Sequence, residues 1–214
     1  MGSTDDDIKM KINQLFPVII PEFKYEGDLA SIISYLNTVE KAQFNFPEGV
    51  YTTKGDLHKH DALAEVTAWF YECLNEYKQE MALQCDRLDI SLMWANNAPP
   101  GSGVGHPRHR HNMSLISAVF YLTEGVATVF HDPIYPRTMD CMEVMSDNLY
   151  SRGGPIEKQA AEPGKLILFP SWLVHESDRH YFDYDRWTIS FNALPAGNIN
   201  PGPFDYPMAN LKVL

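Results

Sequence analysis

The chain contains 214 residues, 44% of them apolar and 12% aromatic, and this composition argues against disorder over most of its length. Its 17 basic and 28 acidic side chains give a formal net charge of −11 at pH 7. Proteins that wrap nucleic acid neutralise phosphates with clustered Lys and Arg, so this acidic chain without a basic block is not expected to bind nucleic acid. No apolar run approaches the roughly 18 residues of a membrane-spanning helix, so no membrane contact is expected either.

The cysteines and the N-terminus bear on compartment and domain organisation. Cys73, Cys85 and Cys141 are odd in number and widely spaced, which indicates neither a disulfide scaffold nor a thiolate zinc site. A reducing, cytoplasmic location is therefore expected. Residues 1–9 are polar and acidic and do not form a secretory signal. We expect them to be a disordered leader or a remnant of cloning, and residues 10–214 to form a single domain.

The first third of the chain predicts an edge strand and two helices. A short apolar run at 15–20, closed by prolines, suits an edge strand. Asp28 can cap a helix whose apolar residues at 29, 32, 33 and 36 have helical spacing. A stronger helix is predicted to begin near Asp61 and to present one packing face. That face consists of Leu63, Val66, Phe70, Cys73, Leu74 and Tyr77.

The rest of the chain predicts β-structure. Short strand-like runs are separated by clusters of Gly, Pro and Asn, a pattern typical of an antiparallel barrel or sandwich. The runs lie at 88–96, 114–122, 126–131, 165–169 and 187–194. We therefore expect a mainly β domain buttressed by the two helices. The stretches 96–105 and 132–155 are long enough to be lids, and the segment after Leu194 is expected to be a surface arm or a loose end.

Histidines provide the first candidate site. The sequence from 105 to 112, Gly-His-Pro-Arg-His-Arg-His-Asn, places His109 and His111 at alternate positions, which share one face of a strand. His106 lies beyond a proline and is predicted to be a loop residue. Neutral imidazole is a common metal ligand, and His175, which follows an apolar strand, is the best candidate for a third ligand. Taken alone, a His-x-His pair is more typical of surface or hydrogen-bonded histidines.

A basic residue on the last predicted strand extends this constellation. Arg186, Thr188 and Ser190 occupy alternate positions and should face the same side of the sheet. A guanidinium group binds a planar carboxylate through two hydrogen bonds, so this face suits an acidic co-substrate inside the barrel. The alternative for Arg186 is a surface ion pair with Asp183 or Asp185.

The order of these residues along the chain, with His109 and His111 first, His175 next and Arg186 last, resembles that of the iron(II)- and 2-oxoglutarate-dependent oxygenases. The similarity is to a subgroup with a run of the form His-x-His-x-x-Ser-x-x-Ser-x-x-Tyr/Phe-Tyr. Together the matching pieces span most of the chain. They are 15–17 (Leu-Phe-Pro), 109–121 (the His-x-His run), 130–133 (Phe-His-Asp-Pro), 168–175 (Leu-Phe-Pro-Ser-Trp-Leu-Val-His) and 186–192 (Arg-Trp-Thr-Ile-Ser-Phe-Asn).

The resemblance implies a double-stranded β-helix core (a jelly roll, as in cupins), one Fe(II) ion and 2-oxoglutarate as co-substrate. It further implies that His109 and His175 are iron ligands and that Arg186 binds the distal carboxylate of 2-oxoglutarate. Three further residues could also contact that carboxylate: Thr188, Ser190 and Tyr121. For each of them, a role as an ordinary strand residue packed inside the barrel is equally typical.

One position departs from the pattern of the wider superfamily. Those enzymes use His-x-Asp/Glu, so that a carboxylate completes the metal site, whereas this chain has His111 there. Either the site contains three histidines, or Asp132 supplies the anionic ligand and His111 lies outside the first coordination sphere. The alternation of side chains along a strand favours His111 as a ligand.

The predicted activity is a dioxygenase that uses O₂ and 2-oxoglutarate, releases succinate and CO₂, and hydroxylates a small molecule or a peptide. Two alternatives are a three-histidine cupin-type metalloenzyme that does not use 2-oxoglutarate and a non-catalytic metal-binding jelly-roll module.

Sheet edges that need cover are compatible with a homo-oligomer. Residues that could line a substrate pocket, but are more typical of a core, are Trp94, Trp172 and Trp187.

Overall fold

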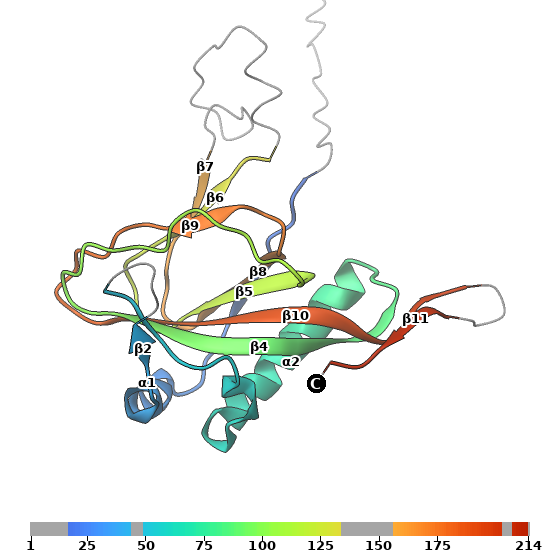
Figure 1. The fold of residues 1–214 in the computed structure, drawn as a ribbon, viewed down its shortest axis with the longest axis horizontal. Coiled ribbons are helices and arrows are strands. Elements are labelled where there is room, and N and C mark those ends of the chain that lie inside the picture. The colour runs from blue at the N-terminus through green and yellow to red at the C-terminus, as the bar shows by residue number, and fades with distance from the viewer. Residues whose placement is uncertain (1–16, 44–48, 134–155, 203–206, 214) are drawn as a thin grey trace, which may run out of the picture.

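Two antiparallel sheets face each other in the computed structural model, which describes residues 17–43, 49–133, 156–202 and 207–213. The eight-stranded major sheet has the order β1-β8-β5-β10-β4-β3-β2, with β11 beside β10. The minor sheet has the order β7-β6-β9 and lies above the major sheet in Figure 1. This arrangement is the jelly roll that the sequence predicts.

The strands of the major sheet are β1 (Glu22–Lys24), β2 (Ala42–Gln43), β3 (Tyr51–Thr52), β4 (Cys85–Ala98), β5 (Ile116–Tyr121), β8 (Lys165–Pro170), β10 (Arg186–Pro201) and β11 (Pro207–Leu211). Those of the minor sheet are β6 (Thr128–His131), β7 (Ile156–Gln159) and β9 (His175–Ser177). The helices are α1 (Leu29–Thr38), α2 (Ala64–Glu80) and two short 3₁₀ turns, η1 (Leu57–Lys59) and η2 (Asp61–Leu63).

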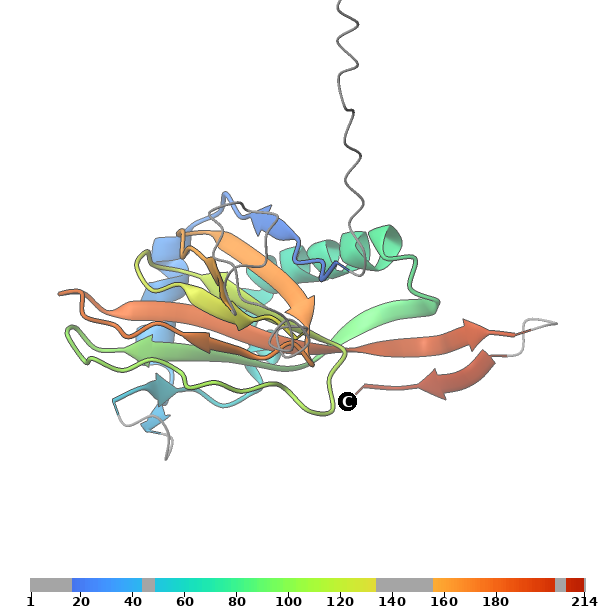
Figure 2. The same cartoon turned by 90° about the horizontal axis from the view of Figure 1, so that it is seen from above.

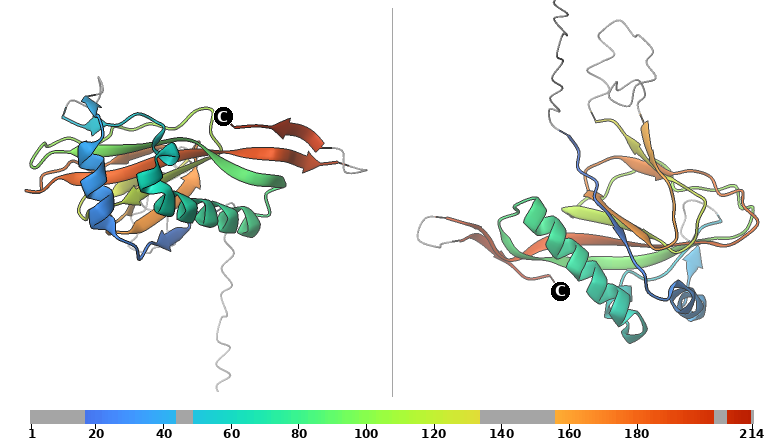
Figure 3. Two further views of the ribbon diagram at one scale, coloured as in Figure 1. Left: turned by 90° about the horizontal axis from the view of Figure 1, so that it is seen from below. Right: turned by 180° about the vertical axis from the view of Figure 1, so that it is seen from behind.

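Both predicted helices are confirmed. Asp28 caps α1, and its carboxylate accepts a hydrogen bond from the backbone N–H of Ser31 at 3.1 Å. Helix α2 crosses the outer face of the major sheet (Figure 3, right). Every residue of its predicted packing face is buried. Phe70 is central to this contact, with ring centroids 5.2 Å from Phe120 of β5 and 5.0 Å from Phe191 of β10.

The inner face of the major sheet is much more polar than the outer face. Strand pairing places Trp94 of β4 opposite Ser190 of β10, and Asn96 opposite Thr188. Thr188 is in turn opposite Tyr121 of β5. Residues directly opposite in an antiparallel pair lie on the same face. The register therefore brings polar side chains from three strands to the interior of the barrel.

The ends of the chain differ from the predictions. The predicted strand at 15–20 is wrong where the structure describes it, because residues 17–20 are not in a strand and the edge strand is β1. Of the two alternatives for the segment after Leu194, the structure shows the surface arm: β10 continues to Pro201 and pairs with β11, and the two strands project from the barrel in Figures 1 and 2. Residues 1–9 and most of the predicted 132–155 lid lie outside the described residues. No helix among the described residues is long and apolar enough to span a bilayer.

Candidate active site

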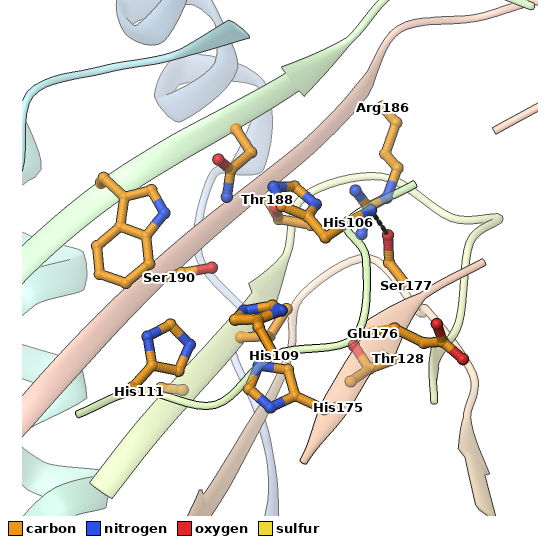
Figure 4. A pocket seen from close by; sticks show the side chains of 14 residues that line it. His106, His109, His111, Thr128, His175, Glu176, Ser177, Arg186, Thr188 and Ser190 are labelled. Carbon is orange, nitrogen blue, oxygen red and sulfur yellow. Dashed lines mark hydrogen bonds between the residues drawn. The ribbon is translucent and has the colours of Figure 1, made fainter. Parts of the chain in front are cut away.

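Three histidine side chains converge between the two sheets. The potential ligand atoms of His109, His111 and His175 all lie within 4.8 Å of one another, so they could hold one metal ion. The ring centroids of His109 and His175 are 4.3 Å apart, and that of His111 lies 5.0 and 5.2 Å from them. Figure 4 shows the three rings grouped on one side of the cavity, opposite Arg186.

Backbone hydrogen bonds hold the histidine-bearing segments together. The N–H of His109 donates to the carbonyl of His175 at 2.8 Å, and the N–H of His175 donates to that of His109 at 2.9 Å. The N–H of His111 donates to the carbonyl of Ser171 at 3.0 Å. The sequence predicts a strand here, but the structure contains a single bridge at His109, and His111 lies outside any strand. Pro107 interrupts the ladder because it has no N–H.

The same region contains the Ser-x-x-Ser part of the motif. Ser117 Oγ donates to Asn192 Oδ1 at 2.9 Å and lies 2.8 Å from Ser171 Oγ, which in turn donates to Ser114 Oγ at 2.9 Å. Because Ser171 also binds the backbone of His111, this buried network fixes the position of that histidine relative to β5 and β10.

Hydrogen bonds also select the tautomer of two rings. Nδ1 of His109 lies 2.7 Å from the carbonyl oxygen of Pro107, and Nδ1 of His175 lies 2.9 Å from that of Leu173. A carbonyl only accepts, so Nδ1 carries the proton in both rings and Nε2 keeps its lone pair. Metal-binding histidines typically have this arrangement, which fixes ring orientation and raises ligand basicity.

Burial keeps two of the imidazoles, those of His111 and His175, neutral. It lowers the pKa of His175 to about 3 and that of His111 to about 4, with smaller contributions from neighbouring histidines. Metal ligands must be unprotonated, so these rings are in the form that binds a cation at neutral pH. Neutral imidazoles suit first-row metals, including iron.

Arg186, Thr188 and Ser190 line a cavity of about 50 Å³ that the three histidines also line. The side chains of these three β10 residues thus share one face, as predicted. Arg186 is only 5% exposed, and burial lowers its pKa to about 10, so the guanidinium remains charged at neutral pH. Its Nε has no hydrogen-bond partner among the described residues. The predicted alternative, a surface ion pair, is wrong because the residue is buried.

Tyr121 and Asp132 differ in their relation to this cavity. The Tyr121 hydroxyl donates to Thr128 Oγ1 at 2.6 Å, and Thr128 lines the cavity. Burial raises the pKa of Tyr121 to about 12, so it remains a hydrogen-bond donor. Asp132 directly follows β6 and, among the described residues, does not belong to the metal-competent cluster, which consists of three histidines.

The sequence reasoning missed His106 as a site residue. It is outside any strand, as predicted, but it lines the cavity, and its ring centroid is 6.4 Å from that of His109. Burial lowers its pKa to about 3, and the Arg186 charge acts in the same direction. Its backbone N–H donates to Ser177 Oγ at 2.8 Å (Figure 4, dashed line). The spacing His-x-x-His-x-His was the available signal, but only contact with β9 turns this ring inward.

Of the three tryptophans named above as candidate pocket residues, Trp94 alone lines the cavity. It lines the cavity beside His111, with ring centroids 5.8 Å apart. Trp172 is 52% exposed, and Trp187 is buried, with the Lys41 ammonium 4.9 Å from its ring centroid. Alternation along β4 places Trp94 and Asn96 on the inner face.

The fold and the site define a jelly-roll protein in which three histidines that could hold one metal ion lie beside a buried guanidinium. The model of the family described as "putative 2OG-Fe(II) oxygenase" matches residues 92–192, the region that contains every site residue discussed above. The match covers just under half of the chain, and together with the three-histidine site it points to an Fe(II)- and 2-oxoglutarate-dependent oxygenase. No curated protein matches the chain significantly.

Solved structures of low sequence identity share the fold. The α-ketoglutarate-dependent epimerase SnoN from nogalamycin biosynthesis is 11% identical, with a TM-score of 0.63 over 91% of this chain and 88% of that one. A Pseudomonas putida prolyl-4-hydroxylase is 14% identical, with a TM-score of 0.56 over 83% and 93%. HygX from Streptomyces hygroscopicus, with nickel and 2-oxoglutarate bound, is 10% identical, with a TM-score of 0.53 over 92% of each chain.

Proposed function

We propose that this oxygenase hydroxylates a C–H bond of a small molecule and converts 2-oxoglutarate to succinate and CO₂. The observation that carries the proposal is the buried Arg186 guanidinium, which lines the same cavity as the three histidines and has no hydrogen-bond partner for Nε among the described residues. A buried charge is costly unless it is paired. A dicarboxylate that reaches both groups supplies the missing anion.

In this proposal His109, His111 and His175 hold Fe(II), and Arg186 binds the distal carboxylate of 2-oxoglutarate through its planar fork. When bound, Fe(II) supplies the activation of O₂ that oxidises the substrate. Thr188 and Ser190 donate hydroxyl hydrogen bonds to the co-substrate, and Tyr121 orients Thr128 through its own hydroxyl. The enclosing strands exclude bulk water, which strengthens these electrostatic contacts.

The proposed substrate class, partners and location have separate support. HygX has been solved with hygromycin B bound and SnoN with nogalamycin RO, so proteins of this fold bind small molecules. The net charge of −11 supports the absence of nucleic-acid and membrane partners. Cys73 and Cys85 are free thiols, as expected of a cytoplasmic protein. The exposed edge of the β10–β11 hairpin is compatible with a homo-oligomer.

The test is an anaerobic titration of the Fe(II)-loaded protein with 2-oxoglutarate, followed by its visible absorbance change and, after O₂ is admitted, by succinate release. The wild type should show both. His175→Ala should lose iron binding. Arg186→Gln should still bind iron, but its affinity for 2-oxoglutarate should fall at least tenfold. His60→Ala, which removes an imidazole from outside the cluster, is the matched control. A full response in Arg186→Gln would show that Arg186 does not bind 2-oxoglutarate, whereas iron binding without any response in the wild type would support a three-histidine enzyme that does not use 2-oxoglutarate.

A further inference from the structure

A second hollow adjoins the histidine cluster. This groove has a volume of about 540 Å³ and is bordered by β3, β4 and the segment from His106 to His111. It shares Trp94, Asn96 and three histidines, 106, 109 and 111, with the small cavity around Arg186. His109 and His111, two of the three metal-competent histidines, therefore line both the small cavity and the larger groove.

The chemistry of the groove differs from that of the cavity. No Lys, Arg, Asp or Glu is among the described residues that line the groove. Its apolar surface comes mainly from Val50, Leu92 and Trp94. Thr52 and Thr53 add hydroxyl groups, which can hydrogen-bond to an uncharged ligand. A charged ligand would lose hydration here without gaining an ion pair.

We propose that this groove binds the substrate and that the substrate is an uncharged small molecule with a planar ring system. The inference rests on the proposed oxygenase function, and it names the substrate class of the same site. A volume of about 540 Å³ lies within the usual range for pockets that enclose a small organic molecule. The shared wall at His109 and His111 presents one end of such a ligand to the reacting centre.

Two residues of β4 determine this selectivity. Leu92 and Trp94 are at alternate positions and point to the same face of the sheet. The Trp94 ring lies next to His111, so a ring that stacks on the indole has its edge close to the metal-competent cluster. Leu92 is 51% exposed and forms the outer part of the apolar wall. A change of charge at this residue alters the groove without disturbing the core.

The experiment uses two probes that differ mainly in charge, 2-naphthol and 2-naphthoate. Their binding to the protein loaded with Mn(II) and 2-oxoglutarate is measured by calorimetry and saturation-transfer NMR. We expect 2-naphthol to bind at least tenfold more tightly than 2-naphthoate. Leu92→Lys should lower the affinity for 2-naphthol at least tenfold and reduce the difference in affinity between the two probes. Met208→Lys, which adds the same charge at an exposed position of β11, should change neither.

Trp94→Leu tests the ring-stacking part of the proposal. It should weaken 2-naphthol about tenfold, which corresponds to about 1.4 kcal/mol, while the circular dichroism spectrum stays unchanged. Equal affinity for the two probes, or wild-type affinity in Leu92→Lys, would overturn the proposal. The anaerobic absorbance response to 2-oxoglutarate should persist in Leu92→Lys, so failure of the substrate assignment is distinguishable from failure of the oxygenase function.

Discussion

A buried charge at Arg186 is the clearest trade-off between stability and function in this chain. The guanidinium is 5% exposed, and no acidic side chain among the described residues forms an ion pair with it. Moving such a group out of water costs free energy that the fold must offset elsewhere. Residues retained at such a cost commonly serve binding rather than stability.

Replacement of Arg186 by methionine should therefore stabilise the ligand-free protein. We expect the free energy of unfolding to rise by about 1–3 kcal/mol, because an unpaired buried charge is replaced by a flexible apolar side chain of similar length. Urea denaturation monitored by circular dichroism measures this change. Arg87→Met is the control: Arg87 is exposed and pairs with Asp89 at 2.8 Å, so its loss should lower stability by at most about 1 kcal/mol. A loss of stability in Arg186→Met would contradict the argument.

At the scale of single residues, the sequence predicted what local geometry determines. The shared face of Arg186, Thr188 and Ser190 follows from the alternation of side chains along a strand, and the cavity confirms it. His106 could not be assigned in the same way. Its inward position depends on contact with Ser177, which is 71 positions away in the chain, and no local period encodes that contact.

Among the elements, the segment from Gly105 to His111 depends on an unusually close approach to β9. A Cβ atom on Gly105 would lie 2.3 Å from the carbonyl oxygen of Ser177 and 2.5 Å from that of Asp178. Both are backbone atoms, so a substitution must displace one of the two segments. These are the segments that carry His109 and His175.

Gly105→Ala should therefore weaken metal binding without unfolding the protein. We expect the affinity for Mn(II), measured by calorimetry, to fall about 10- to 100-fold, as when the support of a metal ligand is removed. Gly101→Ala provides the comparison. Gly101 has a φ of +62°, but a Cβ atom there would meet no heavy atom of the described residues within 4 Å, so its substitution strains the backbone without moving β9. Equal metal affinities in the two variants would refute this role for Gly105.

Helix α2 has a different task, which is to cover the outer face of the major sheet. Phe70→Ala removes the ring that contacts both Phe120 and Phe191 and should lower the free energy of unfolding by about 3–5 kcal/mol. Tyr71→Ala, one position along and 37% exposed, should cost much less. Urea titrations of both variants measure the difference. Similar losses would mean that α2 does not pack through its predicted face.

The elements predicted correctly include the longest ones, and also β5, β6 and β8, which lie in apolar runs closed by turn residues. The packing face of α2 repeats over 17 residues, and β4 and β10 have 14 and 16 residues, so their apolar pattern stands out. Strands β7 and β9 have only 4 and 3 residues and were missed. Their extended conformation comes from pairing with β6, a tertiary contact that the local sequence does not specify.

For the whole molecule, the major sheet separates stability from chemistry. Its outer face packs against α2 in a core that includes Phe120, Ile189 and Phe191. Its inner face carries the polar side chains that line the cavity. The alternation along each strand predicts that two such faces exist, but only the register between strands distant in the chain aligns their polar residues.

Ligands that bind this inner face should stabilise the entire fold through linkage. A ligand at 100 times its Kd that binds only the folded state adds about 2.7 kcal/mol to the free energy of unfolding. For a domain of this size the corresponding rise in Tm is about 5–11 °C. We expect Mn(II) and 2-oxoglutarate together to raise the Tm by more than the sum of their separate effects, because the co-substrate would contact both the cation and Arg186. Differential scanning fluorimetry measures these shifts. In Arg186→Met the Mn(II) shift should remain and the 2-oxoglutarate increment should disappear; a retained increment would show that the co-substrate does not bind at this guanidinium.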